Sequence, residues 1–275
     1  MSHNNQKKIA LINDFTGFGK CSITVALPVI SALKVQCCPI VTSVFSNHTA
    51  YPEYFFDDYT EKMQEYIDQW KKLDLKFEGI ATGFLGSEEQ IEIVCRFISE
   101  FKLKETVLIV DPVMGDYGVK YETYTKEMCQ KMKKLVSMSD IITPNLTECC
   151  ILTNTPYRDD MDFATVRKMA EELAGMGPEK IVITGIERNH YINNFVYEKG
   201  KKEKIIKSKK IGISRSGTGD LFSAIISADA VNGVGFETSV RKAIHFIKKC
   251  IIISEKRDIP TEDGVCFEDV LTTLK

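Results

Sequence analysis

The chain has 275 residues, of which 44% are hydrophobic and 27% charged, and its net charge is -2. This composition is typical of a soluble globular protein, and the near-neutral charge gives no reason to expect a nucleic-acid or anionic-membrane partner. Nine cysteines are spread along the chain without a Cys-x-x-Cys pair. An odd number with this spacing favours reduced thiols over a disulfide framework or a structural zinc site.

The sequence shows no pattern typical of a signal peptide or of a membrane-spanning segment. Residues 1–8 are polar and lack the apolar stretch of a signal peptide, and no apolar run is long enough to span a bilayer. We therefore expect a cytoplasmic protein. Since the chain shows no repeat, low-complexity tract or long linker, we expect residues 1–275 to form a single domain.

Short apolar, β-branched runs alternate with amphipathic stretches along most of the chain. Strands are predicted at residues 9–13, 36–44, 79–83, 107–111, 141–143 and 181–184, and helices at 22–33, 57–73, 87–101, 126–136 and 163–175. The strands are almost continuously apolar, which is typical of parallel strands covered on both faces. Two antiparallel strands (191–197 and 204–211) and three helices (217–232, 237–256 and 267–274) follow. The pattern predicts a doubly wound α/β/α sandwich with a mostly parallel central sheet and an antiparallel edge.

Polar side chains follow the predicted strands at the points where these strands end. They are Asn13-Asp14, Ser46-Asn47-His48-Thr49, Phe84, Asp111, Thr143-Pro144-Asn145 and Thr184-Gly185. Because ligands bind beyond the carboxyl ends of parallel strands, we expect these residues to converge on one edge of the sheet.

The segment Gly217-Thr218-Gly219-Asp220 precedes an apolar helix. Glycines let backbone N–H groups approach an anion closely, and a helix N-terminus adds free N–H donors and a partial positive charge. An acid in the first turn can meet a hydroxyl beside a bound phosphate. The tetrapeptide alone favours a simple turn with an aspartate near the helix cap. The strand-end context favours catalysis, with Asp220 as the base.

Two further segments suit a metal and phosphate site. Asp111 and Asp116 lie in a Pro/Gly loop at a strand end, a setting that suits Mg²⁺ held through water and substrate phosphates, although such a loop is also an ordinary turn. Asn145 and Glu148 fit a capping arrangement for the next helix, which does not prevent Glu148 from facing a metal through water. The chain contains no Walker-type P-loop. The Lys-rich stretch 199–210 is interrupted by Glu203, which favours a solvated hairpin over a nucleic-acid site.

The chain resembles the ribokinase-like superfamily and, within it, the pyridoxal kinase family. The resemblance rests on five motifs in the family's order, spread over nearly the whole chain: residues 45–49 with Tyr51, residues 83–87, residues 111–116, residues 143–148 and residues 217–220.

The resemblance implies ATP-dependent phosphorylation of the 5′-hydroxymethyl group of pyridoxal, pyridoxine or pyridoxamine, by a homodimer that uses Mg²⁺ and a monovalent cation such as K⁺. It implies that Asp220 is the general base and that the amides of Gly217, Thr218 and Gly219 form an anion hole. The vitamer would contact Asp14, Ser46, His48, Thr49 and Phe84. The metal region would comprise Asp111, Thr143 and Glu148. ATP would lie along Asp116, Tyr121, Asn145, Thr184, Gly185, Ser208, Ile211 and the anion hole.

Two positions depart from the family pattern. Asp14 stands where many members carry serine, and Phe84 stands where many carry tyrosine. Ionised Asp14 offers only acceptors, so it could pair with a protonated pyridine nitrogen or with an amine. The preferred vitamer therefore stays open, as do two alternatives: a hydroxymethylpyrimidine kinase of the same fold, and a non-catalytic B6-binding protein. Pyrimidine kinases tend to have cysteine where this chain has Asp220, which favours the vitamer kinase.

Overall fold

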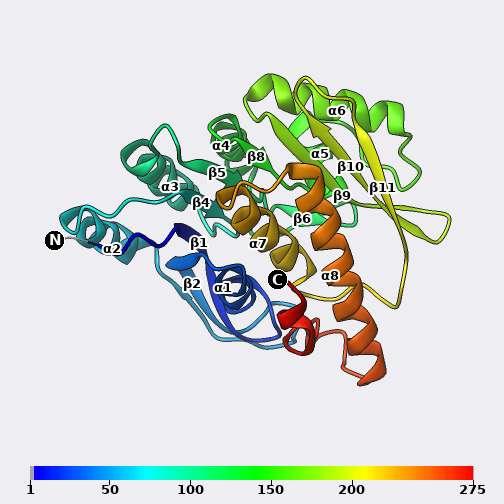
Figure 1. The fold of residues 1–275 in the computed structure, drawn as a ribbon, viewed down its shortest axis with the longest axis horizontal. Coiled ribbons are helices and arrows are strands. Elements are labelled where there is room, and N and C mark those ends of the chain that lie inside the picture. The colour runs from blue at the N-terminus through cyan, green and yellow to red at the C-terminus, as the bar shows by residue number, and fades with distance from the viewer. Residues whose placement is uncertain (1–2, 275) are drawn as a thin grey trace.

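The computed structural model describes residues 3–274, which form a nine-stranded sheet with helices on both faces (Figure 1). The strand order is β11-β10-β9-β8-β5-β4-β1-β2-β3. Six strands are parallel: β1 (Lys8–Phe18), β2 (Gln36–Asn47), β4 (Gly79–Thr82), β5 (Val107–Val110), β8 (Ile141–Ile142) and β9 (Lys180–Arg188). Antiparallel strands form the two edges: β3 (Phe56–Asp58) at one, and β10 (Tyr191–Glu198) with β11 (Lys204–Lys209) at the other. The predicted doubly wound α/β/α architecture is confirmed.

Apolar residues on alternate sides of each strand build a core on each face of the sheet. In β1, Ala10 and Ile12 enter one core, whereas Ile9 and Leu11 enter the other. This two-sided burial is why the strands are nearly continuously apolar in sequence.

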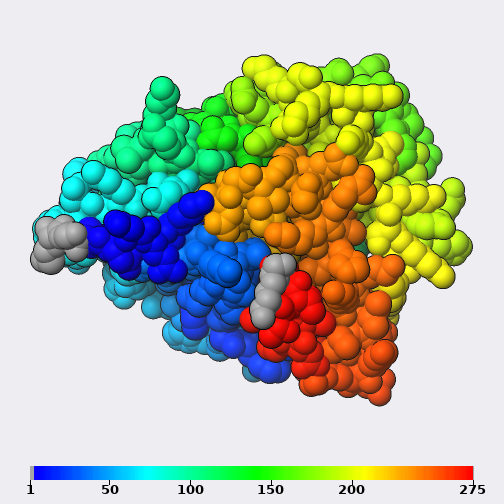
Figure 2. Space-filling view, viewed as in Figure 1, coloured from blue at the N-terminus to red at the C-terminus, as the bar shows by residue number. Residues whose placement is uncertain are grey.

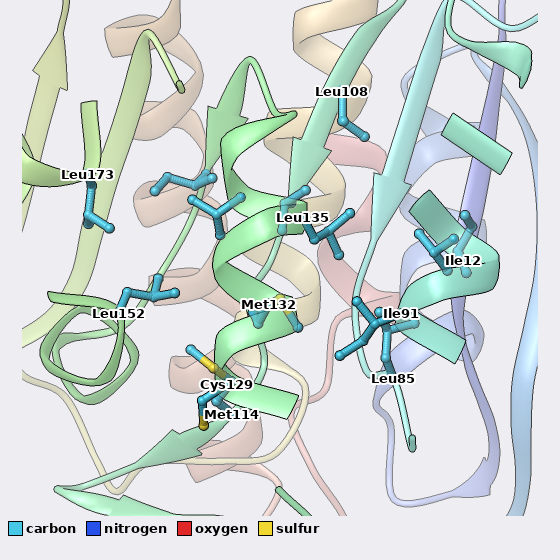
Figure 3. Close-up of a cluster of buried hydrophobic side chains, with 14 of the residues drawn as sticks. Ile12, Leu85, Ile91, Leu108, Met114, Cys129, Met132, Leu135, Leu152 and Leu173 are labelled. Carbon is cyan, nitrogen blue, oxygen red and sulfur yellow. The ribbon is translucent and has the colours of Figure 1, made fainter. Parts of the chain in front are cut away.

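Five helices cover the first face and follow one another from the left of Figure 1 to its upper right. They are α2 (Thr60–Lys72), α3 (Glu88–Phe101), α4 (Lys126–Ser137), α5 (Leu146–Thr153) and α6 (Phe163–Met176). Figure 3 shows side chains of this core, where Met132 and Leu135 of α4 lie between those of neighbouring elements.

The second face is covered by α1 (Ser22–Ala32), α7 (Thr218–Val231) and α8 (Phe236–Lys256). A short 3₁₀ helix, η1 (Glu268–Leu274), packs against α1 and α8. A two-stranded hairpin of β6 (Gly115–Asp116) and β7 (Val119–Lys120) stands apart from the main sheet. Among residues 3–274 the structure contains no helix with the length and apolar character that a bilayer crossing requires.

Several predicted boundaries were wrong. The strands expected to end at Val44 and Thr184 run on to Asn47 in β2 and to Arg188 in β9. The first strand was expected to end at Asn13, but β1 runs on to Phe18 beyond a register shift between Asn13 and Phe15. The second helix was expected from Asp57, but Asp57 belongs to edge strand β3 and α2 begins at Thr60. The last helix, expected at 267–274, is a 3₁₀ helix.

Candidate active site

The N-terminus of α7 is pressed against the turn that joins β1 to α1. Gly217 is the N-cap, with a φ of 84° in the left-handed region, and a Cβ there would overlap the carbonyl oxygen of Lys20. Only glycine meets both demands without strain. We call residues 215–219 the phosphate loop. Because the first amides of a helix lack intrahelical partners, those of Thr218 and Gly219 are available to an anion.

Asp220 lies in the first turn of α7 and faces the end of β1. Its Oδ1 accepts a 3.4 Å hydrogen bond from Asn13 Nδ2. Burial raises the pKa of Asp220 from 3.8 to about 6; the Ser22 amide partly offsets this effect, and the charge of Asp14 adds to it. The carboxylate is therefore ionised at neutral pH and retains more proton affinity than an exposed aspartate.

Near the register shift in β1, the side chains of Asn13 and Asp14 lie close to Asp220. Asn13 Oδ1 accepts hydrogen bonds from the amides of Asp14 (3.0 Å) and Phe84 (2.8 Å), which ties β1 to the end of β4. Asp14 is only 5% exposed, and its Oδ2 accepts a 2.6 Å bond from Thr16 Oγ1. Burial raises the pKa of Asp14. Asn13 and Asp14 thus meet Asp220 from a distant segment of the chain, where the sequence predicted.

We call residues 46–51, which comprise the end of β2 and the turn beyond it, the acceptor loop. Ser46 Oγ accepts a 2.8 Å bond from the amide of Phe55, and Thr49 is exposed. His48 Nε2 lies 2.5 Å from the carbonyl oxygen of Glu262, so its imidazole is engaged by the C-terminal segment. Phe84 is half-buried and packs edge-on against Phe45, with ring centroids 6.2 Å apart.

Two acids approach one another at the ends of β5 and β8. Asp111 follows β5 directly, and Glu148 lies in the first turn of α5, where it forms a capping box with Asn145. Glu148 Oε1 accepts a 3.1 Å bond from the Met114 amide and Oε2 a 2.8 Å bond from the Asn145 amide. Burial raises the pKa of Glu148, and the charge of Asp111 adds to this effect. Burial and the charge of Asp220 raise the pKa of Asp111.

This acidic pair fits a divalent cation that draws its other ligands from water and substrate phosphates. No group of three His, Cys, Asp or Glu side chains within residues 3–274 could hold a metal by itself. Mg²⁺ commonly uses one or two carboxylates and completes its shell with waters and phosphate oxygens. The buried hydroxyl of Thr143 has no hydrogen-bond partner in the structure and adds a third oxygen. Both oxygens of Glu148 already accept amide bonds, so Glu148 suits contact through water.

A cavity of about 410 Å³ opens beside the phosphate loop. Of the residues expected along ATP, all but Tyr121 and Gly217 line it: Asp116, Asn145, Thr184, Gly185, Ser208, Ile211, Thr218 and Gly219. The structure places Tyr121 outside the lining, with its amide bonded to Met114 O and its side chain 43% exposed.

Sequence reasoning missed one wall of this cavity. Ile244, Ile247, Lys248 and Ile251 of α8 line it, together with Phe222 of α7. The three isoleucines form a helical stripe in the sequence. Such a stripe is typical of an apolar helix face, and it does not show that this face borders a cavity.

The β6–β7 hairpin borders the cavity and is tied to α5. Asn145 Nδ2 donates to Gly115 O at 2.8 Å, and the Gly118 amide donates to Thr147 Oγ1 at 2.8 Å. Asp116 in this hairpin lines the cavity. The first turn of α5 thus positions both an acid of the candidate metal site and the hairpin above it.

Comparison with known proteins identifies relatives over most of the chain. A family model described as phosphomethylpyrimidine kinase matches residues 22–264. A thiamine biosynthetic bifunctional enzyme of Arabidopsis thaliana is 26% identical over 249 residues, which are 87% of this chain and only 45% of that protein. A pyridoxal kinase of Leifsonia xyli is 24% identical over 247 residues, 86% of each chain.

One solved structure combines close similarity with a bound small molecule. It comes from Bacteroides thetaiotaomicron, is named provisionally as a phosphomethylpyrimidine kinase, and was crystallised with pyridoxal. Its sequence is 34% identical to this chain, its TM-score is 0.95, and the match covers 98% of this chain and 96% of that one.

Proposed function

The chain belongs to the phosphomethylpyrimidine kinase family, and we propose that within this family it phosphorylates the 5′-hydroxymethyl group of pyridoxal, pyridoxine or pyridoxamine with ATP. The observation that carries the proposal is the position of Asp220. Its carboxylate, with a pKa raised to about 6, lies in the first turn of a helix whose preceding amides are free for a phosphate. The Bacteroides relative that was crystallised with pyridoxal supports this choice of acceptor.

In this mechanism Asp220 takes the proton of the substrate hydroxyl as its oxygen attacks the γ-phosphorus of ATP. The bond from the γ-phosphorus to the β–γ bridging oxygen breaks, and ADP leaves. A base works best when its pKa lies near the working pH while it remains ionised, and a pKa of about 6 meets this condition at pH 7 to 8.

The phosphoryl group in flight carries negative charge that backbone donors can stabilise. The amides of Thr218 and Gly219 lie at the positive end of α7, two residues and one residue before Asp220. Transfer of this kind depends mainly on alignment and charge neutralisation. Asp111 and Thr143 would hold Mg²⁺ directly and Glu148 through water, and the bound cation would neutralise phosphate charge. The cavity beneath the β6–β7 hairpin would take the nucleotide, with Ser208 and Ile211 on its adenine side.

A hydroxymethylpyrimidine kinase is the second candidate. Two observations favour it: the description of the family model, and the relationship to the thiamine biosynthetic enzyme of Arabidopsis. The site supports both acceptors because each is a hydroxymethyl group on a small nitrogen ring. The aspartate at position 220, in place of the cysteine typical of pyrimidine kinases, favours the vitamer.

The discriminating experiment measures ADP release from ATP and Mg²⁺ with each of four acceptors: pyridoxal, pyridoxine, pyridoxamine and hydroxymethylpyrimidine. We expect the highest kcat/KM with a B6 vitamer and a further increase on adding K⁺. Turnover of hydroxymethylpyrimidine alone would transfer the proposal to the second candidate. Tight pyridoxal binding without ADP release from any acceptor would instead indicate a non-catalytic B6-binding protein.

We extend the proposal to the organisation of the protein. One continuous sheet takes strands from residues 8 to 209, which supports a single kinase domain over residues 1–275. We further propose that this domain works as a homodimer. Light scattering after size exclusion tests the assembly, and a monomeric mass at full activity would refute it.

A further inference from the structure

The loop between α8 and η1 contacts the acceptor loop through two hydrogen bonds. We call residues 259–265 the clasp. His48 Nε2 lies 2.5 Å from Glu262 O, and Tyr51 Oη donates to Asp263 Oδ1 at 2.7 Å. His48 and Tyr51 also pack together, with ring centroids 4.9 Å apart. The clasp therefore holds the acceptor loop by a backbone carbonyl and a carboxylate, each with one aromatic partner.

The same loop contacts the phosphate loop. The amide of Val265 donates to Ser216 O at 3.2 Å. Gly264 has a φ of 83°, and a Cβ there would overlap the carbonyl oxygen of Gly19. This oxygen belongs to the turn against which Gly217 is pressed. Figure 2 shows the C-terminal segment (red) packed between the N-terminal part of the chain (blue) and α8 (orange).

Arg215 joins the phosphate loop to the clasp most directly, because its main chain is part of the phosphate loop and its side chain binds the clasp. It is only 7% exposed. Its Nη1 donates to Ile259 O at 2.7 Å and to Pro260 O at 3.0 Å, and its Nη2 donates to Glu255 at 2.9 Å. Its own carbonyl oxygen accepts a 3.1 Å bond from Thr218 Oγ1. A buried guanidinium is costly unless such partners compensate it, so these bonds fix the start of the clasp relative to the phosphate loop.

We propose that the clasp, anchored by Arg215, is a positioning element that sets the distance between the acceptor loop and the phosphate loop. The inference rests on the proposed kinase function, because the two loops would hold the two reactants. In-line transfer needs the attacking oxygen and the phosphorus in near-contact, and a displacement of about 1 Å can lower the rate by about 100-fold. Arg215 acts through the loops and touches neither reactant, so it is a positioning residue.

Arg215→Met and Arg215→Lys provide the test, with Arg257→Met as the matched control. Arg257 lies at the end of α8 and pairs with Asp269 on the surface. We expect Arg215→Met to raise the KM of the acceptor and to lower kcat by about 10- to 100-fold. The expected loss corresponds to a displacement of the acceptor loop relative to the phosphate loop of up to about 1 Å. A lysine can still bond one of the two carbonyl groups, so Arg215→Lys should recover part of the loss.

A second readout does not depend on activity. Amide hydrogen exchange in the unliganded protein should accelerate in residues 46–51 and 259–265 of Arg215→Met and stay unchanged in Arg257→Met. If the wild-type protein shows no turnover with any acceptor, the kinase proposal fails while the exchange result still decides whether Arg215 couples the loops. Unchanged exchange in the acceptor loop, or a kcat equal to that of the control, would overturn the inference.

Tyr51→Phe and Asp263→Asn provide the test if Arg215→Met does not fold. Each removes or weakens the single bond between Tyr51 and Asp263 without exposing a buried charge. We expect both variants to raise the acceptor KM. The double variant should lose no more than the more damaging single one, because the two substitutions break the same contact. Fully additive losses, or no change in acceptor KM, would count against the clasp.

Discussion

Replacement of Asp220 by asparagine separates the chemical role of this residue from its structural cost. The asparagine keeps the size of the side chain and can still accept the bond from Asn13, but it cannot take a proton. A positioned base contributes about 100- to 10,000-fold to a rate, so we expect kcat to fall by at least about 100-fold. The free energy of unfolding should instead rise, because the ionised carboxylate of Asp220 is largely desolvated in the folded protein.

The magnitude of this stability change follows from the pKa. The folded value is about 6 and the ordinary value is 3.8. At about 1.4 kcal/mol per pKa unit, ionisation of the buried group costs the folded state up to about 3 kcal/mol. Because the folded pKa is raised, this cost is absent below pH 3.8 and complete once the pH has risen through about 6. Asp220→Asn should therefore be more stable than the wild type at pH 8, and this advantage should shrink towards pH 4.

The assays are ADP release across pH 5 to 9 and thermal unfolding at pH 4 and at pH 8. The wild-type kcat/KM should fall on the acid side with an apparent pKa of about 6. Asp229→Asn is the matched control, because Asp229 lies buried on the same helix and pairs with Lys242 at 2.6 Å, away from the site. It should lose stability and keep its kcat. A near-normal kcat in Asp220→Asn would refute the base assignment, and a lower melting temperature at pH 8 would refute the burial argument.

Three further substitutions test the remaining parts of the site. Gly217→Ala should lower the melting temperature and kcat, because it forces an alanine into the left-handed region against Lys20 O. Gly219→Ala is the control and should keep its stability, because no atom lies within 4 Å of its Cβ. Equal melting temperatures of the two variants would contradict this account. Asp111→Asn should raise the Mg²⁺ concentration needed for half-maximal activity. In EDTA it should also raise the melting temperature, because the raised pKa of Asp111 means that the fold disfavours its ionised form. An unchanged Mg²⁺ requirement would exclude Asp111 from the metal site. Asp14→Ser should lower kcat/KM for pyridoxamine, relative to kcat/KM for pyridoxine, by about tenfold, because a hydrogen bond to a charged group contributes about 1.5 kcal/mol. An unchanged ratio of the two values would show that Asp14 does not recognise the amine.

The sequence predicted the strands well where burial of their side chains produces an apolar run. It predicted them less well where only backbone hydrogen bonds to a neighbouring strand hold the segment. Residues 14–18 of β1 are held by pairing with β2 rather than by a core, and Phe15 and Phe18 there are exposed. Hydrophobic periodicity therefore carries no signal for this extension. The start of α2 was misplaced for a related reason, because Asp57 and Asp58 sit in an edge strand that no apolar pattern marks.

Helix caps were more informative than periodicity at α5. Seven of its eight residues are buried, so the helix shows no amphipathic pattern. The capping box of Asn145 and Glu148 was nonetheless visible in the sequence and is confirmed. Local hydrogen bonding can thus locate a helix start even where the hydrophobic signal is uniform.

The candidate site was predictable to the extent that it lies at strand ends. The parallel sheet brings Asp111, Asn145, Thr184 and Asp220 to one edge, as expected. The wall provided by α8 and the contact between His48 and Glu262 depend on how distant segments pack. No local pattern encodes such contacts, so they emerge only from the tertiary structure.

The two edges of the large sheet bear on how the protein behaves at high concentration. Strand β11 is exposed along one edge and presents Lys204, Lys207 and Lys209, while β3 at the other edge is three residues long and carries two aspartates. Short strands and charged side chains discourage the unpaired backbone of an edge from joining another molecule. The lysines of the 199–210 stretch thus oppose aggregation, because their charge disfavours pairing of the edge of this nine-stranded sheet with a strand of another molecule.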